Sequence, residues 1–109
     1  MGDKKIRGGA LVARALKDKG IDNVFTLSGG FCNPALEGFM ECQINVINCP
    51  HEQIAGHLAD GHTRISRKPS VCIVGPEGFA NAVPSMMEAW GERSPVIFIT
   101  GSSSLKRQG

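Results

Sequence analysis

The sequence predicts an α/β protein with three layers, in which helices cover both faces of a parallel sheet of about four strands. The first observation is the order of the elements, because four strand-like runs alternate with four helical patterns along the 109 residues. The second is the composition of residues 71–74 and 96–99, which are continuously apolar, as expected for strands buried on both faces. From the alternation and these doubly apolar strands we expect a sheet of strand order 2-1-3-4, with right-handed crossovers.

Local signals justify the individual elements. Gly20 directly follows the first helical pattern and is expected to end that helix. Asn33 is expected to cap the second helix, with Pro34 at its first position. The helices are expected at residues 9–19, 33–41, 51–66 and from the loop at 75–78 to about 91, and the strands at 23–27, 44–48, 70–74 and 95–100.

The helix expected at residues 51–66 carries a glutamate, Glu52, in its first turn. Because Pro50 has no N–H, it suits the first helical position, which makes Cys49 the N-cap and puts Glu52 at N3. One interpretation of Glu52 is therefore structural, as half of a capping box beside the positive helix end. The face expected to be buried consists of Ile54, Ala55, Leu58, Ala59, His62 and Ile65.

Composition indicates a single domain, residues 1–109, with a hydrophobic core. Hydrophobic residues make up 41% of the chain and charged residues 20%, which favours a folded globule over disorder. The net charge is +2 without a basic face, and no apolar run approaches the roughly 20 residues of a membrane span. We therefore expect no nucleic-acid or membrane partner. The amino terminus lacks the apolar core of a signal peptide, which favours a cytoplasmic protein.

The cysteines and histidines do not predict a metal site. The four cysteines include no C-x-x-C pair, so reduced and packed thiols are expected. His51, His57 and His62 are six and five residues apart, rather than the four that place two ligands on one helical face.

Three features are expected to meet at one edge of the sheet, because ligands of such sheets lie at the carboxyl ends of the strands. They are the glycine turn at residues 28–30, the pair at 51–52 and the loop at 75–81. Glycine loops that lead into helices can hold anions through backbone N–H groups, but neither loop has a phosphate-binding fingerprint. Taken singly, each glycine cluster is better interpreted as plain turn chemistry than as an anion site.

The sequence resembles the pyrimidine-binding domain of thiamine diphosphate-dependent enzymes of the acetolactate synthase type. The most specific stretch is H-E-Q-x-A-G-x-x-A-D-G-x-x-R at residues 51–64. The remaining stretches extend the likeness almost from end to end; they are residues 9–20 with 24–25, 28–30, 68–72, 75–81 with 89–90, and 94–101. The resemblance implies a partial, doubly wound thiamine diphosphate-binding fold.

The resemblance also implies a role for Glu52. In this family the equivalent glutamate bonds N1′ of the cofactor's aminopyrimidine, which favours the tautomer that takes the proton from C2 of the thiazolium ring. A carboxyl group in a poorly solvated pocket suits such acid–base work. The cofactor acts as the electron sink, and the protein orients and tunes it. Glu52 is thus the candidate catalytic residue.

The same likeness implies further contacts with the cofactor. The glycines after the first strand match the loop that lines its reactive end, the loop at 75–78 matches a Gly-Pro-Gly-type loop, and Asn81 matches a family asparagine near the pyrimidine. The candidate cofactor-binding residues are Gly29, Gly30, Glu52, Gly75, Pro76, Gly78 and Asn81.

Three residues depart from the family pattern around that loop. Glu77 adds a carboxylate and Phe79 a bulky ring where small residues are common. Pro84 falls early in the following helix, which accommodates it only if the helix starts late.

A family pyrimidine domain has about two further strand–helix units, and the cofactor's diphosphate and Mg²⁺ belong to another domain, which carries a G-D-G motif absent from this sequence. In this family the cofactor lies between the pyrimidine domain of one subunit and the diphosphate-binding domain of another. The resemblance therefore implies half of a site, inactive alone, in an excised or truncated piece of a longer enzyme that forms at least a homodimer.

Two classes of function follow. The first is a pyrimidine half-site of an enzyme that joins or cleaves carbon–carbon bonds of 2-keto or 2-hydroxyacyl compounds, with acetolactate synthase as first choice and oxalyl-CoA decarboxylase or 2-hydroxyacyl-CoA lyase as alternatives. The second is a non-catalytic α/β association module. The small residues of the 51–66 helix, which permit close helix approach, favour association through this helix and its neighbour at 76–90.

Overall fold

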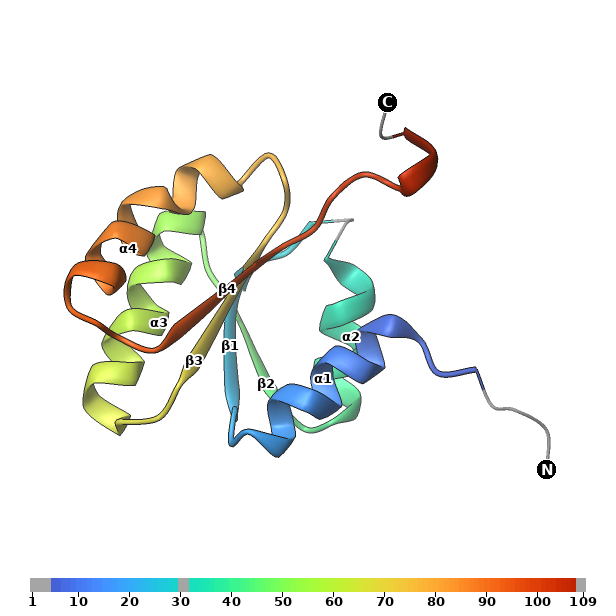
Figure 1. Ribbon diagram of the computed structural model, residues 1–109, viewed down its shortest axis with the longest axis horizontal. Coiled ribbons are helices and arrows are strands. Elements are labelled where there is room, and N and C mark those ends of the chain that lie inside the picture. Colours follow the sequence, from blue (N-terminus) through green and yellow to red (C-terminus); the bar gives the residue numbers. More distant parts are fainter. Residues whose placement is uncertain (1–4, 30–31, 108–109) are drawn as a thin grey trace.

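The computed structural model describes residues 5–29 and 32–107 and shows a parallel four-stranded sheet between two helical layers (Figure 1). Helices α1 and α2 cover one face, and α3 and α4 cover the other. The elements are α1 (Gly8–Asp18), β1 (Asn23–Leu27), α2 (Asn33–Glu41), β2 (Asn45–Asn48), α3 (Glu52–Ser66), β3 (Ser70–Val74), α4 (Phe79–Gly91), β4 (Val96–Thr100) and the short 3-10 helix η1 (Leu105–Arg107).

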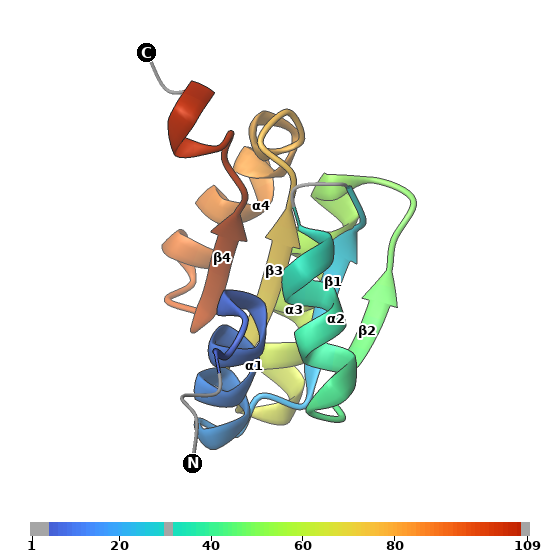
Figure 2. The ribbon, with the colours of Figure 1, turned by 90° about the vertical axis from the view of Figure 1, so that its right-hand side faces the viewer.

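The strand order is β2-β1-β3-β4, and every pairing is parallel, which confirms the predicted topology. Phe25 of β1 lies opposite Ile47 of β2 and Cys72 of β3. Strand β3 is buried along its whole length, as its apolar run predicts. The same expectation is wrong for β4, because β4 forms an edge of the sheet in the described part of the chain and leaves Ile97 42% exposed (Figure 2).

Successive residues of the central strands feed two separate cores. Val24 and Val71 face α1 and α2, whereas Phe25 and Cys72 face α3 and α4. The four cysteines are free thiols, and Cys32, Cys49 and Cys72 are buried. Burial raises the pKa of the Cys72 thiol to about 12, so this thiol packs as a small apolar group.

The buried face of α3 differs from the predicted one. Ala55 and Ala59 are buried as expected, but Ile54 and Leu58 are 44% and 45% exposed and Ile65 is 88% exposed. The helices α3 and α4 approach too closely for large side chains, since a Cβ at Gly56 would lie 1.8 Å from Ser85 Oγ. The small residues therefore form the α3–α4 contact, and the large apolar residues point away from it. The residues of α3 that are buried are Ala55, Gly56, Ala59, Asp60 and Thr63.

The buried carboxylate of Asp60 on α3 pairs with Arg64, which also contacts α4. Arg64, one turn later, places Nη2 2.9 Å from Asp60 Oδ2 and 3.3 Å from Glu88 Oε1 on α4. Burial raises the pKa of Asp60, but hydrogen bonds from Ser94 and Arg64 outweigh it and hold the pKa below its ordinary value. The ionised form of Asp60 is therefore part of the folded state.

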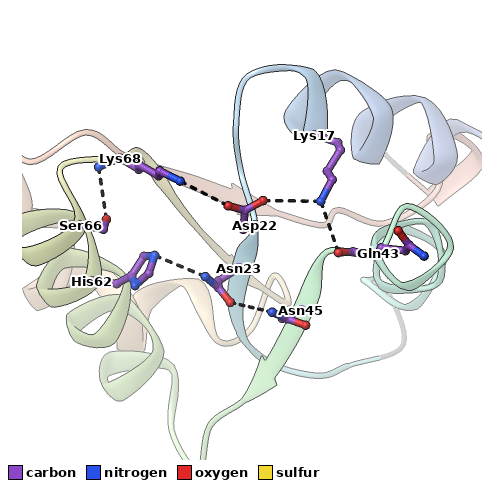
Figure 3. A network of polar contacts seen from close by, with 8 residues as sticks. All are labelled: Lys17, Asp22, Asn23, Gln43, Asn45, His62, Ser66 and Lys68. Atoms are coloured by element: carbon purple, nitrogen blue, oxygen red, sulfur yellow. Dashed lines mark hydrogen bonds and ion pairs between the residues drawn. The ribbon is translucent and has the colours of Figure 1, made fainter.

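A polar network ties the layers together at the amino-terminal edge of the sheet (Figure 3). Asp22 lies 3.5 Å from Lys17 Nζ of α1 and 3.6 Å from Lys68 Nζ beyond α3. Asn23 Nδ2 lies 3.4 Å from His62 Nε2, and Asn45 Nδ2 donates to Asn23 Oδ1 at 3.2 Å. Most of these contacts are exposed, so they fix the relative position of the helices rather than adding much stability.

The helix ends combine confirmed and corrected predictions. Gly20 ends α1 with φ +86°, as predicted. Asn33 is the first residue of α2, not its cap, because Cys32 occupies the N-cap position. Pro84 lies inside α4, which starts early, at Phe79. Within residues 5–29 and 32–107, no helix is long and apolar enough to span a membrane.

Candidate functional site at the carboxyl edge of the sheet

The loops that follow β1, β2 and β3 meet at the carboxyl-terminal edge of the sheet (Figure 1). The Ser28 N–H donates to Asn48 Oδ1 at 3.2 Å, which holds the end of β1 beside the end of β2. The Cys49 N–H donates to Thr26 O at 2.6 Å and extends the same pairing by one residue. This arrangement brings the start of α3 to the edge where the sequence predicts a site.

The N-cap of α3 is His51 rather than the predicted Cys49. Because the Cys49 N–H is committed to β1, the backbone is still extended there and the helix begins at Glu52. The His51 side chain caps it, with Nδ1 accepting from the Gln53 N–H at 3.0 Å. Glu52 is therefore at N1, and the predicted capping box with Glu52 at N3 is wrong. This capping role of His51 was not predicted, since histidine is not among the favoured capping residues.

Glu52 is held by the residues of the loop after β3 and the first turn of α4. Its side chain is 14% exposed. Asn81 Nδ2 donates to Glu52 Oε2 at 3.3 Å, and His51 Nε2 lies 4.0 Å from the same oxygen. A Cβ at Gly78 would lie 2.6 Å from Glu52 Oε1, so the carboxylate rests directly on the glycine backbone. Three predicted site residues, Glu52, Gly78 and Asn81, thus lie together.

The loop at residues 75–78 is a tight turn closed by a hydrogen bond from the Gly78 N–H to Gly75 O at 3.1 Å. Pro76 and Glu77 form its tip, where Glu77 is exposed. Gly78 is buried against Glu52, and the Asn81 N–H donates to Gly78 O at 3.1 Å as α4 starts. The turn therefore positions both the glycine under the carboxylate and the asparagine beside it.

The structure shows fewer contacts for the glycines after β1 than for the turn at residues 75–78. The Cys32 N–H donates to Gly29 O at 2.9 Å, and no atom lies within 4 Å of a Cβ at Gly29, so this residue borders open space. Gly30 lies outside the described residues. In the part of the chain that the structure describes, no group of three or more histidine, cysteine or acidic side chains could hold a metal ion.

The class of protein is given by a family that matches the chain over nearly its whole length. The family described as "Thiamine pyrophosphate enzyme, N-terminal TPP binding domain" matches residues 6–109, so the chain belongs to this family. The solved structure of a thiamine diphosphate-dependent 4-hydroxybenzoylformate decarboxylase from Rhodococcus jostii has the same fold, with a TM-score of 0.83 and 19% sequence identity over 90% of this chain and 19% of that one.

Two relatives show which members of this family the chain is similar to in sequence. The acetolactate synthase large subunit IlvG of Mycobacterium tuberculosis is 38% identical over 106 residues, which cover 95% of this chain and 19% of that protein. The 2-hydroxyacyl-CoA lyase 2 of Danio rerio is 35% identical over 104 residues, which cover 94% of this chain and 17% of that protein. The chain therefore spans about a fifth of the length of these relatives.

Proposed function

We propose that this chain supplies the aminopyrimidine half of a thiamine diphosphate site, with Glu52 as its acid–base group. The observation that carries the proposal is the setting of the carboxylate. Glu52 is partly buried at the start of α3. Asn81 donates a hydrogen bond to one carboxylate oxygen, Oε2, and Gly78 places no side chain beside the other, Oε1. A purely structural glutamate at a helix start needs neither neighbour.

The residues present fit an aminopyrimidine. Within the described residues, Glu52 Oε1 accepts no hydrogen bond, although a carboxylate can accept several. Any side chain at position 78 would cover this oxygen, since even a Cβ would lie 2.6 Å away. Glu52 Oε1 is therefore an acceptor that no side chain at position 78 covers, which suits the edge of a ring that bears an N–H group.

The roles of the chain's own residues follow from that arrangement. When bound, thiamine diphosphate supplies an acidic thiazolium carbon and an electron sink. Glu52 Oε1 holds or releases a proton at N1′ of the pyrimidine, and Asn81 fixes Oε2 so that the carboxylate does not rotate away. Gly75, Pro76 and Gly78 form the supporting turn. Gly29 lines the reactive end in this proposal.

The reaction class we propose is the making or breaking of carbon–carbon bonds in 2-keto or 2-hydroxyacyl compounds. Acetolactate synthase is the first choice, because the chain is 38% identical to an acetolactate synthase subunit and 35% identical to a 2-hydroxyacyl-CoA lyase. A 2-hydroxyacyl-CoA lyase or an oxalyl-CoA decarboxylase is the alternative. A diphosphate-binding domain of a partner subunit supplies the Mg²⁺ and diphosphate contacts, so this chain alone is inactive. Its four free thiols, three of them buried, support a cytoplasmic location.

A second function, association, is favoured by the outer surface of α3 and α4. Ile54 and Leu58 on α3 and Phe79, Val83 and Met87 on α4 are all more than a third exposed, and each set repeats along one side of its helix. The predicted reason for association is wrong, because the small residues of α3 are used within the chain. Phe79, Val83 and Met87 lie on the side of α4 that points away from α3, and they support the same proposal: a second copy covers this side of α4 in at least a dimer.

An NMR titration of the isotope-labelled chain with the free aminopyrimidine moiety of thiamine tests the half-site. This probe carries no phosphate, so it reports on the pyrimidine contacts alone. We expect the largest shift changes at Glu52, Gly78 and Asn81, and we expect the Glu52→Ala variant to lose them. Shift changes spread elsewhere, or unchanged in that variant, contradict the proposal.

A further inference from the structure

The imidazole of His51 connects the start of α3 to the carboxylate of Glu52. Its Nδ1 accepts from the Gln53 N–H at 3.0 Å, and its Nε2 lies 4.0 Å from Glu52 Oε2. An imidazole nitrogen accepts a hydrogen bond only while it carries no proton. The cap therefore requires the neutral tautomer of His51 that carries its proton on Nε2, the nitrogen nearer to the carboxylate.

The His51 ring is open to water and has one carboxylate close to it. The side chain is 48% exposed, so protons reach it from solvent. Among the residues that the structure describes, Glu52 is the one acidic side chain within 4.0 Å of the ring. Glu77, in the turn after β3, stays beyond that distance. His57, one turn further along α3, contacts the Gln53 side chain instead, with 3.5 Å between the two Nε2 atoms. Glu52 is therefore the ionisable group that a charge on His51 affects first.

We propose that His51 is a positioning residue for Glu52 that acts only in its neutral form, so that the aminopyrimidine half-site weakens as His51 gains a proton. This inference rests on the proposed function and adds a control by pH to it. Protonation makes Nδ1 a donor that faces the Gln53 N–H, which removes the cap. The imidazolium also attracts Glu52 Oε2, the oxygen that accepts from Asn81. A positive charge there favours the ionised carboxylate, so Glu52 holds a proton at N1′ less readily.

The first measurement is an NMR titration of the isotope-labelled chain without ligand, between about pH 8 and about pH 6, where histidine changes its charge. We expect the Gln53 amide, which reports on the cap, and the Asn81 side-chain amide, which reports on Glu52, to shift together with the His51 ring. A histidine that only caps the helix would leave the Asn81 signal unchanged. That result overturns the proposal.

Two matched variants assign the shifts to His51. His51→Asn keeps a capping side chain that gains no proton in this range, so the fold should persist while both amides lose their pH-dependent shifts. His57→Asn removes another histidine of α3 and leaves the cap, so both amides should keep their shifts. Shifts that persist in the His51→Asn variant, or that vanish in the His57→Asn variant, contradict the assignment.

Binding of the free aminopyrimidine moiety separates this inference from the proposed function. We expect its affinity to fall at least about 3-fold more between about pH 8 and about pH 6 in the parent chain than in the His51→Asn variant. Protonation of the probe is the same in both titrations and cancels in this comparison. Equal pH dependence of binding in the two proteins leaves the half-site intact and shows the role of His51 to be wrong. If neither protein binds the probe at about pH 8, the half-site fails, and the amide shifts alone decide whether His51 controls Glu52.

Discussion

Replacement of Gly78 by alanine should displace Glu52 while leaving the fold intact. A Cβ at this position would lie 2.6 Å from Oε1, 2.7 Å from Cγ and 2.9 Å from Cδ of Glu52. Favourable contacts between carbon atoms lie at about 3.5–4.0 Å, so the carboxylate must move by roughly 1 Å. The hydrogen bond from Asn81, which is already 3.3 Å long, is then lost.

The cost in stability is small because the group that moves is the end of a flexible side chain. Loss of one hydrogen bond costs about 0.5–1.5 kcal/mol. The backbone of Gly78 has φ −81°, which alanine adopts without strain, so the lower entropy of the unfolded chain returns about 0.4–1 kcal/mol. We therefore expect the free energy of unfolding to change by about 1 kcal/mol or less.

Urea denaturation and titration with the aminopyrimidine moiety measure the two quantities on the same variant. We expect affinity to fall by at least about 10-fold, the scale of an interaction worth 1.4 kcal/mol. The control is Gly91→Ala at the end of α4, where no atom lies within 4 Å of a new Cβ. Unchanged affinity of the Gly78→Ala variant, or unfolding of that variant, would refute this reasoning.

Three further predictions concern packing, association and pH. Gly38→Ala should destabilise the chain by about 3 kcal/mol in urea denaturation, because its Cβ would lie 2.4 Å from the backbone oxygen of Gly9; a loss below 1 kcal/mol would count against this helix crossing. The chain should sediment as a dimer at about 100 μM and Met87→Glu as a monomer; a monomeric parent chain excludes the proposed interface. Since the pKa of Asp60 is lowered in the folded state, its contribution to stability is present above the unfolded-state pKa of about 3.9 and is lost as pH falls through the folded-state pKa. Asp60→Asn should therefore flatten the acid side of the stability profile, and an unchanged slope would show that Asp60 is not a linked group.

The sheet could be predicted because its signals are local. The apolar run of β3 and the alternation of elements indicate a buried parallel strand, and the order 2-1-3-4 is typical of doubly wound sheets with this alternation. The burial of β4 could not be predicted, because an apolar run is the same at an edge as in the centre. Edge position depends on which strands pair.

The face of α3 shows a second limit. Periodicity locates an apolar stripe, but it does not say whether the stripe packs within the chain or stays at the surface. Ile54 and Leu58 belong to the surface, while Gly56 and Ala59 accommodate α4. The signal that was available is the run of small residues itself, because only they allow such close helix packing.

Glu52, Gly78 and Asn81 were predicted as site residues from the family resemblance, and the contacts among them were not predicted. The role of His51 was missed because the helix start was inferred from Pro50 alone. The deciding interaction, the Cys49 N–H bonded to Thr26 O, joins two strands and leaves no trace in the local sequence.

The most direct test of the central claim is the Glu52→Gln substitution in a full-length enzyme that contains this domain, with cofactor C2 proton exchange and unfolding measured on the same protein. If Glu52 only supports the start of α3, loss of its charge costs about 0.3–1 kcal/mol of stability and leaves exchange unchanged. If Glu52 is the acid–base group, exchange slows by about 10²-fold or more with a similarly small change in stability. We predict the second result. Normal exchange at saturating cofactor would contradict the assignment of Glu52 and with it the proposed half-site.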